Sequence, residues 1–116
     1  MNSTKKKPLS GSDNAKEIVL ATDPVLIHET PQGLAYSEIW LFTINRSNTP
    51  VSLEFKINGT RIPIGPIPSG NHLQDLYGGT GAITYSGDNF EAVADVPNDL
   101  SIVGWVYEVK KETKNG

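Results

Sequence analysis

Apolar and polar residues alternate cleanly in one segment of the chain and do not alternate in the segment before it. In VSLEFKI (51–57) every second residue is apolar, as expected of a β-strand with one buried face. In EIWLFTI (38–44) both faces are apolar, because Trp40 and Phe42 lie opposite Leu41. The first pattern predicts an ordinary half-buried strand, and the second predicts a strand that is covered on both sides.

Short apolar runs rich in Val, Ile, Leu and aromatic residues recur between clusters of Gly, Pro, Asn and Asp, and no window has a helical stripe. The predicted strands are 16–21, 24–30, 36–44, 51–57, 60–64, 71–77, 81–86, 90–95 and 100–109. Asn58-Gly59 suits a tight primed hairpin turn, and GPIPSG (65–70) is expected to be an extended connector. About 8–9 short strands punctuated by turns predict an all-β fold, an antiparallel, jelly-roll-like β-sandwich.

The 116 residues are enough for one domain. We expect a flexible basic N-terminal arm over residues 1–15, the sandwich over 16–110 and a disordered tail over 111–116. Three lysines and one aspartate give residues 1–14 a charge of +2, which leaves −5 on the rest, since the whole chain carries −3. An acidic body argues against nucleic-acid binding. No run is apolar enough for a membrane span or a secretory signal, so we expect no membrane partner.

No pattern of residues predicts catalysis, a metal site or a cofactor, so we expect a protein that is not an enzyme. There is no cysteine, and His28 and His72 are too few for a zinc site, so both are expected to be half-buried structural residues. GGTGA (78–82) lacks the lysine and the helix of a phosphate-binding loop. The remaining candidates are acidic side chains without calcium-loop spacing, expected to be solvated: Asp88, Glu91, Asp95 and Asp99.

Two predicted strands, 36–44 and 100–109, are apolar on both faces. One explanation is that a loop of the same chain, such as GPIPSG, covers the second face. The other is that a second chain covers it, because Trp and Tyr are enriched in interfaces and monomers rarely expose such a patch. The second explanation predicts a homo-oligomer, most simply a closed ring. The residues predicted to form its interface are Trp40, Phe42, Ile44, Trp105 and Tyr107.

The order of these segments resembles that of small all-β virion proteins of tailed bacteriophages, of the capsid decoration (cement) type. The similarity covers about residues 29–107. The matching pieces are Thr30-Pro31-Gln32-Gly33, EIWLFTINRS, VSLEF, IPSG at 67–70 and IVGWV at 102–106. The resemblance implies a β-sandwich, often trimeric, that decorates or stabilises phage capsids or serves as an accessory piece of heads and tails.

On this resemblance we expect a structural virion protein on the capsid surface, assembled in the host cytoplasm, whose partners are its own copies and the major capsid protein. The basic arm, with Lys5, Lys6 and Lys7, is expected to contact the capsid, although it is not part of the matching pattern. Two alternatives remain open. One is a tail or connector accessory protein, and the other is a carbohydrate- or receptor-binding sandwich that uses Trp40 or Trp105 as a platform.

Overall fold

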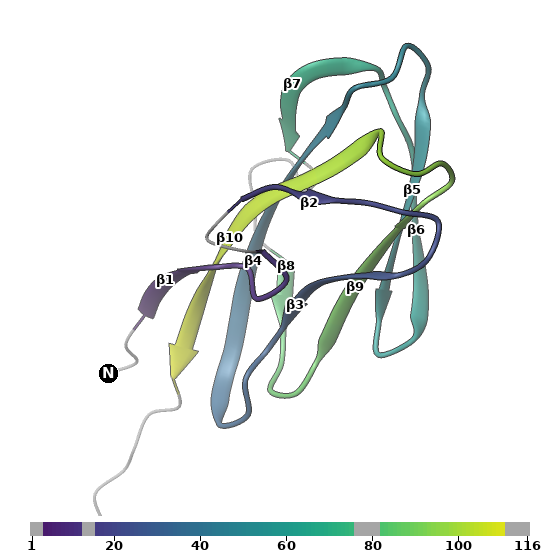
Figure 1. Ribbon diagram of the computed structural model, residues 1–116. Helices are drawn as coiled ribbons and strands as arrows, with labels where there is room; N and C mark the ends of the chain where they lie inside the picture. Colours follow the sequence, from purple (N-terminus) through teal and green to yellow (C-terminus); the bar gives the residue numbers. More distant parts are fainter. Residues whose placement is uncertain (1–3, 13–15, 76–81, 111–116) are drawn as a thin grey trace, which may run out of the picture.

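A computed structural model describes residues 4–12, 16–75 and 82–110, and within these ranges the chain is all-β (Figure 1). Every strand pairing is antiparallel. The strands are β1 (Thr4–Pro8), β2 (Ile18–Val19), β3 (Val25–Glu29), β4 (Leu34–Asn45), β5 (Val51–Ile57), β6 (Thr60–Ile67), β7 (Gly70–Asp75), β8 (Ala82–Thr84), β9 (Asn89–Ala94) and β10 (Leu100–Lys110).

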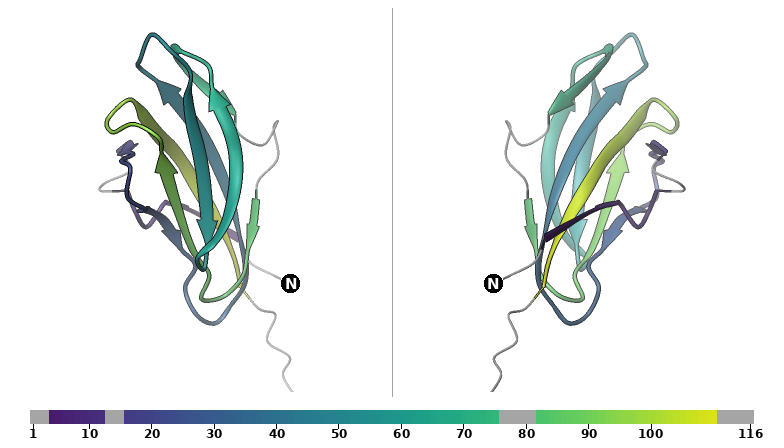
Figure 2. Two further views of the ribbon diagram at one scale, coloured as in Figure 1. Left: turned by 90° about the vertical axis from the view of Figure 1, so that its right-hand side faces the viewer. Right: turned by 90° about the vertical axis from the view of Figure 1, so that its left-hand side faces the viewer.

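The strands form two sheets that pack face to face (Figure 2). One sheet has the order β1-β10-β4-β7, with β2 also paired to β10 and β8 also paired to β4. The other has the order β3-β9-β5-β6. Most connections cross from one sheet to the other, and this strand order is that of a jelly roll. The predicted fold class is confirmed.

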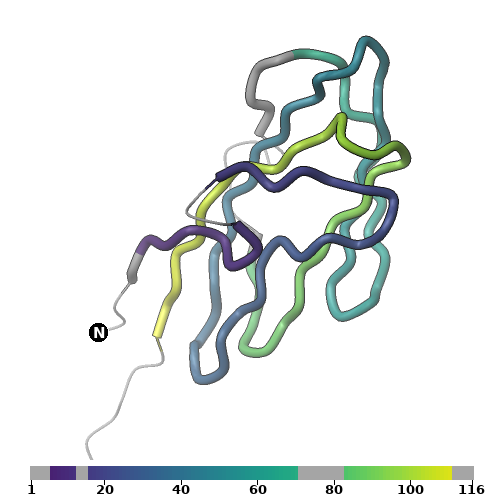
Figure 3. The backbone as a smooth tube through the Cα atoms, viewed as in Figure 1, coloured from purple at the N-terminus to yellow at the C-terminus, as the bar shows by residue number. Residues whose placement is uncertain are grey.

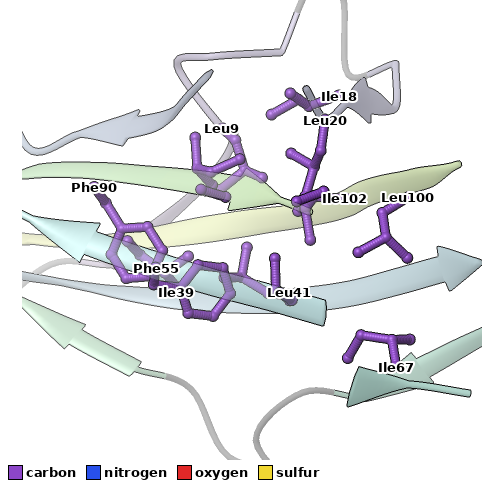
Figure 4. Close-up of a cluster of buried hydrophobic side chains, with 14 of the residues drawn as sticks. Leu9, Ile18, Leu20, Ile39, Leu41, Phe55, Ile67, Phe90, Leu100 and Ile102 are labelled. Carbon is purple, nitrogen blue, oxygen red and sulfur yellow. The ribbon is translucent and has the colours of Figure 1, made fainter. Parts of the chain in front are cut away.

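The core lies between the sheets, where alternate residues of each strand point inward (Figure 4). The β5 pattern behaves as predicted, because Leu53 and Phe55 are buried while Ser52 is exposed. Phe55 packs on Phe90 of β9, with ring centroids 4.8 Å apart. From the opposite sheet, Ile39 of β4 and Val106 of β10 are fully buried in the same cluster. Both sheets therefore contribute to one apolar core.

Two turns have the conformations that their residue types favour. Asn58 and Gly59 both have positive φ, 51° and 85°, so the β5–β6 hairpin has the predicted primed turn. In the β4–β5 loop, the buried Asn45 side chain donates to the Thr49 carbonyl at 2.9 Å and accepts from the Ser47 backbone N–H at 2.9 Å. These bonds are the local side-chain-to-backbone interactions that Asn favours in turns.

The segment GPIPSG is not only a connector. Residues up to Ile67 continue β6, and a shift of register between Leu53 and Glu54 lets Gly65, with φ of 105°, pair with Leu53. The Ile67 side chain is buried in the core. Pro63 and Pro66 are tolerated because β6 is the edge strand of its sheet.

The expectation of a flexible arm over residues 1–15 is wrong for residues 4–12, which belong to the fold. Thr4–Pro8 forms β1, which pairs with β10 from Thr4↔Val109 to Pro8↔Trp105. Leu9 follows at 1% exposure in the core cluster, and Lys7 pairs with the buried Glu108 carboxylate at 2.7 Å. The lysine-rich composition hid an edge strand, since lysine is a common residue on edge strands. The tail over 111–116 lies outside the described residues.

Replacing Leu9 with Ala tests whether this segment belongs to the fold. We expect the free energy of unfolding in urea to fall by about 2–5 kcal/mol, because a fully buried leucine leaves a cavity. Ile64→Ala serves as the matched control, since Ile64 is 36% exposed, and it should cost clearly less. Equal, small effects of the two substitutions would contradict the assignment of Leu9 to the core.

Candidate functional site

Strands β4 and β10 pair along the whole length of β10 and place the predicted aromatic residues on one surface. Trp40 lies directly opposite Trp105 in the register, and Phe42 lies opposite Val103. The two indoles are stacked with centroids 6.4 Å apart and planes 11° from parallel. The Phe42 ring is 5.3 Å from Trp105. We define the aromatic face as the outward side chains Trp40, Phe42, Ile44, Val103, Trp105 and Tyr107.

All six side chains of the aromatic face are half-buried, neither closed into a core nor free in water. Their neighbours in sequence, such as Ile39 and Leu41, point into the sandwich and are buried. The explanation that GPIPSG covers the aromatic face is wrong for residues 65–67, which belong to β6 of the other sheet. The outer side of this sheet is therefore not covered by residues 65–67.

Polar groups flank the aromatic face and orient its rings. The Trp40 indole Nε1–H donates to the Glu38 carboxylate at 2.7 Å. The Lys6 ammonium lies 4.6 Å from the centroid of the Trp105 ring, within range of a cation–π interaction. The Trp105 Nε1–H is buried and has no hydrogen-bond partner in the described part of the chain. A buried donor without a hydrogen-bond partner costs free energy, so the Trp105 indole N–H is an unfavourable feature of this surface in the isolated chain.

A break in the sheet edge lies beside Trp105. Strand β1 pairs with β10 as far as Trp105, and β2 begins to pair at Ile102. Between them, Val103 and Gly104 have a described strand partner only in β4. A groove of about 380 Å³ opens at this point. Its lining residues are Lys6, Lys7, Pro8, Val103, Gly104 and Trp105.

Gly104 is required where the two long strands approach each other. A Cβ atom at this position would lie 2.0 Å from the carbonyl oxygen of Trp40. Glycine within a strand often marks such a close approach of another backbone. Gly104 thus allows the register that brings the two tryptophans together.

The outward side of the other sheet has a different character. There β5 presents Ser52, Glu54 and Lys56, and Arg61 of β6 pairs with the Glu54 carboxylate at 2.9 Å. Pro63, Pro66 and Val93 lie beside them in the register, so this surface is mixed but mostly charged and polar. The protein therefore has one polar sheet face and one aromatic sheet face, which marks the aromatic face as the candidate functional surface.

Sequence reasoning missed the parts of this surface that come from short strands. The register Glu38↔Ile83 places Ile83 of β8 beside the aromatic face, and Ile83 and Tyr85 are 45% and 61% exposed. The alternation in AITYS carried this signal. The contribution of Lys6 and Pro8 had no signal in the sequence, because it depends on the pairing of β1 with β10.

The titratable candidates whose side chains are described make structural contacts within the fold. His28 is 3% exposed, and thus buried rather than half-buried as expected, whereas the side chains of His72 and Asp75 lie outside the described residues. Asp88 and Asp95 accept hydrogen bonds from the backbone N–H groups of Tyr85 and Ser52. Among the described side chains, no group of three or more His, Cys, Asp or Glu residues could hold a metal ion.

Comparisons with protein families, curated proteins and solved structures find no match to this chain. Over residues 4–12, 16–75 and 82–110, the protein has no helix of the length and apolarity needed to cross a membrane.

Replacing Gly104 with Ala tests the geometry of the paired tryptophans. The added methyl group would meet the Trp40 carbonyl, so we expect a loss of at least about 1–3 kcal/mol of unfolding free energy. The near-ultraviolet circular dichroism of the stacked indoles should also change. Val103→Ala, the neighbouring control, should keep the spectrum. A Gly104→Ala protein with wild-type stability and spectrum would contradict the close approach.

Proposed function

We propose that this protein is a structural, non-enzymatic virion protein that associates with its own copies through the aromatic face and decorates an assembled capsid. The observation that carries the proposal is the contrast between the two outer sheet surfaces. One is charged and suited to water, and the other presents Trp40, Phe42, Trp105 and Tyr107. Clustered aromatic side chains of this kind are enriched in the centres of protein interfaces.

The size of the aromatic face suits a stable contact between subunits. The outer side of this part of the sheet is formed by β4 with 12 residues, β10 with 11, β1 with 5 and β8 with 3. At about 3.3 Å per residue and about 4.8 Å between strands, it covers about 490 Å², which is more than half of the roughly 800 Å² per partner of a standard interface. A second copy of this chain can therefore cover the face, whereas a small ligand would cover only part of it.

A closed trimer is the assembly that we propose, with the aromatic faces of three copies turned toward a common axis. Closed symmetry limits growth, so that each ring buries its aromatic faces and leaves the polar sheets outward. The jelly-roll order supports the assignment at the level of analogy, since this fold is frequent in viral capsid proteins and also in lectins.

Capsid stabilisation would follow from binding linkage. A ring that binds only the assembled shell, at a junction of major capsid protein subunits, stabilises that shell by about 2.7 kcal/mol per site when its free concentration is a hundred times Kd. Lys6 and Lys7 already contact Trp105 and Glu108 of their own sheet. A capsid contact through these lysines would therefore use the sandwich edge and not a free arm.

Carbohydrate or receptor binding is the second candidate function, and the groove beside Trp105 favours it. A half-buried indole next to an open hollow of about 380 Å³ could stack against a sugar ring. In that case the tryptophans would stay accessible in the purified protein. A tail or connector accessory protein would use the same self-association, and only the site of binding on the virion would differ.

Charge introduced into the aromatic face should dissociate the oligomer. We expect wild-type protein to sediment as a trimer and Phe42→Glu to sediment as a folded single copy, because an interface cannot bury the added carboxylate without a partner. Val93→Glu is the matched control: this valine is half-buried on the outward side of the polar sheet, and its replacement should keep the trimer. A single-copy wild-type protein at high concentration would contradict self-association.

Binding to capsids that lack this protein tests the assignment to the virion. Wild-type protein should co-sediment with such capsids and raise the temperature at which they disrupt. Phe42→Glu should bind more weakly, because a single copy makes one contact with the capsid where a trimer makes several at once. Trimers that never co-sediment with capsids but bind isolated tails would support the accessory-protein alternative. Trimers that bind neither would contradict a virion role.

A further inference from the structure

His28 is the one histidine whose side chain the structure describes, and its environment is unusual. It lies in β3, is 3% exposed, and accepts a hydrogen bond at Nδ1 from the backbone N–H of Ser10 at 3.0 Å. Because Nδ1 acts as an acceptor, the ring is neutral and carries its proton on Nε2. That Nε2–H is buried without a partner in the described part of the protein.

The hydrogen bond between Ser10 and His28 is one of several that attach the segment after β1 to β3 of the opposite sheet. The Ser10 hydroxyl accepts from the Glu29 backbone N–H at 2.7 Å, and the Gly11 N–H donates to the Ile27 carbonyl at 3.0 Å. A Cβ atom on Gly11 would lie 2.0 Å from the Leu26 carbonyl oxygen. The backbone is thus pressed against β3, and the segment bridges the edges of the two sheets (Figure 3).

The charged groups around His28 come from three strands. Burial lowers the pKa of His28, and the negative charges of Glu108 on β10 and Glu29 on β3 oppose this shift in part. Lys7 of β1 neutralises much of the Glu108 charge through its ion pair. On β9, His28 is paired with Phe90, which offers no charge. The surroundings therefore favour the neutral ring at neutral pH.

We propose that His28 is a pH-sensitive latch that holds the N-terminal strand on the sandwich, and that protonation of its ring releases Ser10 and β1. A protonated Nδ1 would present its own N–H to the N–H of Ser10, so that two donors would face each other. The added positive charge would also be buried, which is unfavourable. Release of the segment lets water reach the ring and removes both costs.

Release of β1 would change the aromatic face. This strand supplies the Lys6 ammonium over Trp105 and, with Pro8, one side of the groove. Without β1, more of the Trp105 ring and one edge of β10 would be open to a partner. This consequence for assembly rests on the proposed function, whereas the latch itself does not.

The direction of the effect follows from proton linkage. A histidine whose folded pKa is lowered binds protons more weakly in the latched form than in the released form. The latch is therefore complete above a pH of about 6.5, the ordinary value for histidine. As the pH falls below this value, opening increases by up to about tenfold per pH unit, until it levels off below the pKa of latched His28.

Nuclear magnetic resonance of the full chain between about pH 7.5 and pH 4.5 tests the latch. The chain has two histidines, so their ring signals can be assigned with single variants. We expect the His28 ring to titrate below about 6.5 and the hydrogen-exchange protection of the Ser10 and β1 amides to fall over the same range. Amides of β5 should keep their protection, because β5 pairs with β6 and β9 and not with the N-terminal segment.

His28→Asn is the informative variant, since its side-chain oxygen can accept the Ser10 N–H but does not titrate; it should remove the pH-dependent loss at β1. His72→Asn is the control and should preserve it. The latch would be refuted by unchanged β1 protection while His28 protonates, by the same loss in His28→Asn, or by an equal loss in β5. If the Asn variant does not fold, the comparison of β1 with β5 in the wild-type protein still tests the proposal.

Discussion

The antiparallel pairing of β4 with β10 is the interaction on which the rest of the structure depends. It runs along all of β10 and joins the edge strands β1 and β2 to the edge strands β7 and β8. Its inward residues contribute to the core, and its outward residues include two stacked indoles. Because side chains alternate along a strand, the same register fixes both surfaces, and a shift by one residue would exchange them.

The strands with regular alternation could be predicted from the sequence, because one buried face leaves a period of two that needs no tertiary information. Strand β5 and its Asn58-Gly59 turn are the clearest cases. The two-sided apolarity of β4 was also visible, and it led to the aromatic face. The order of the strands within the sandwich could not be predicted, because alternation alone does not specify which strands pair.

The features that were missed depend on contacts distant in sequence. Three lysines and a proline indicate a solvated arm, yet β1 is held by the ion pair of Lys7 with Glu108 on the last strand and by the burial of Leu9 in the core. The role of Gly104 could not be predicted, because it depends on how closely the Trp40 carbonyl oxygen of the neighbouring strand approaches. Likewise, the buried His28 accepts a hydrogen bond from Ser10, which composition had assigned to the arm.

A sandwich with one polar and one aromatic sheet face suits a protein that works by association. The aromatic face would be covered in the assembly, the polar sheet would remain in water, and the N-terminal strand would lie at the border between them. In this arrangement, the proposed latch at His28 and the proposed interface share β1 and Trp105. A change at the sandwich edge could therefore be transmitted to the contact between copies.

Acrylamide quenching of tryptophan fluorescence tests the central claim most directly, since the chain has two tryptophans and both belong to the aromatic face. We predict that quenching falls as the protein concentration rises and copies associate. Quenching that stays the same from dilute to concentrated protein, with a single-copy mass throughout, would contradict burial of the aromatic face between copies.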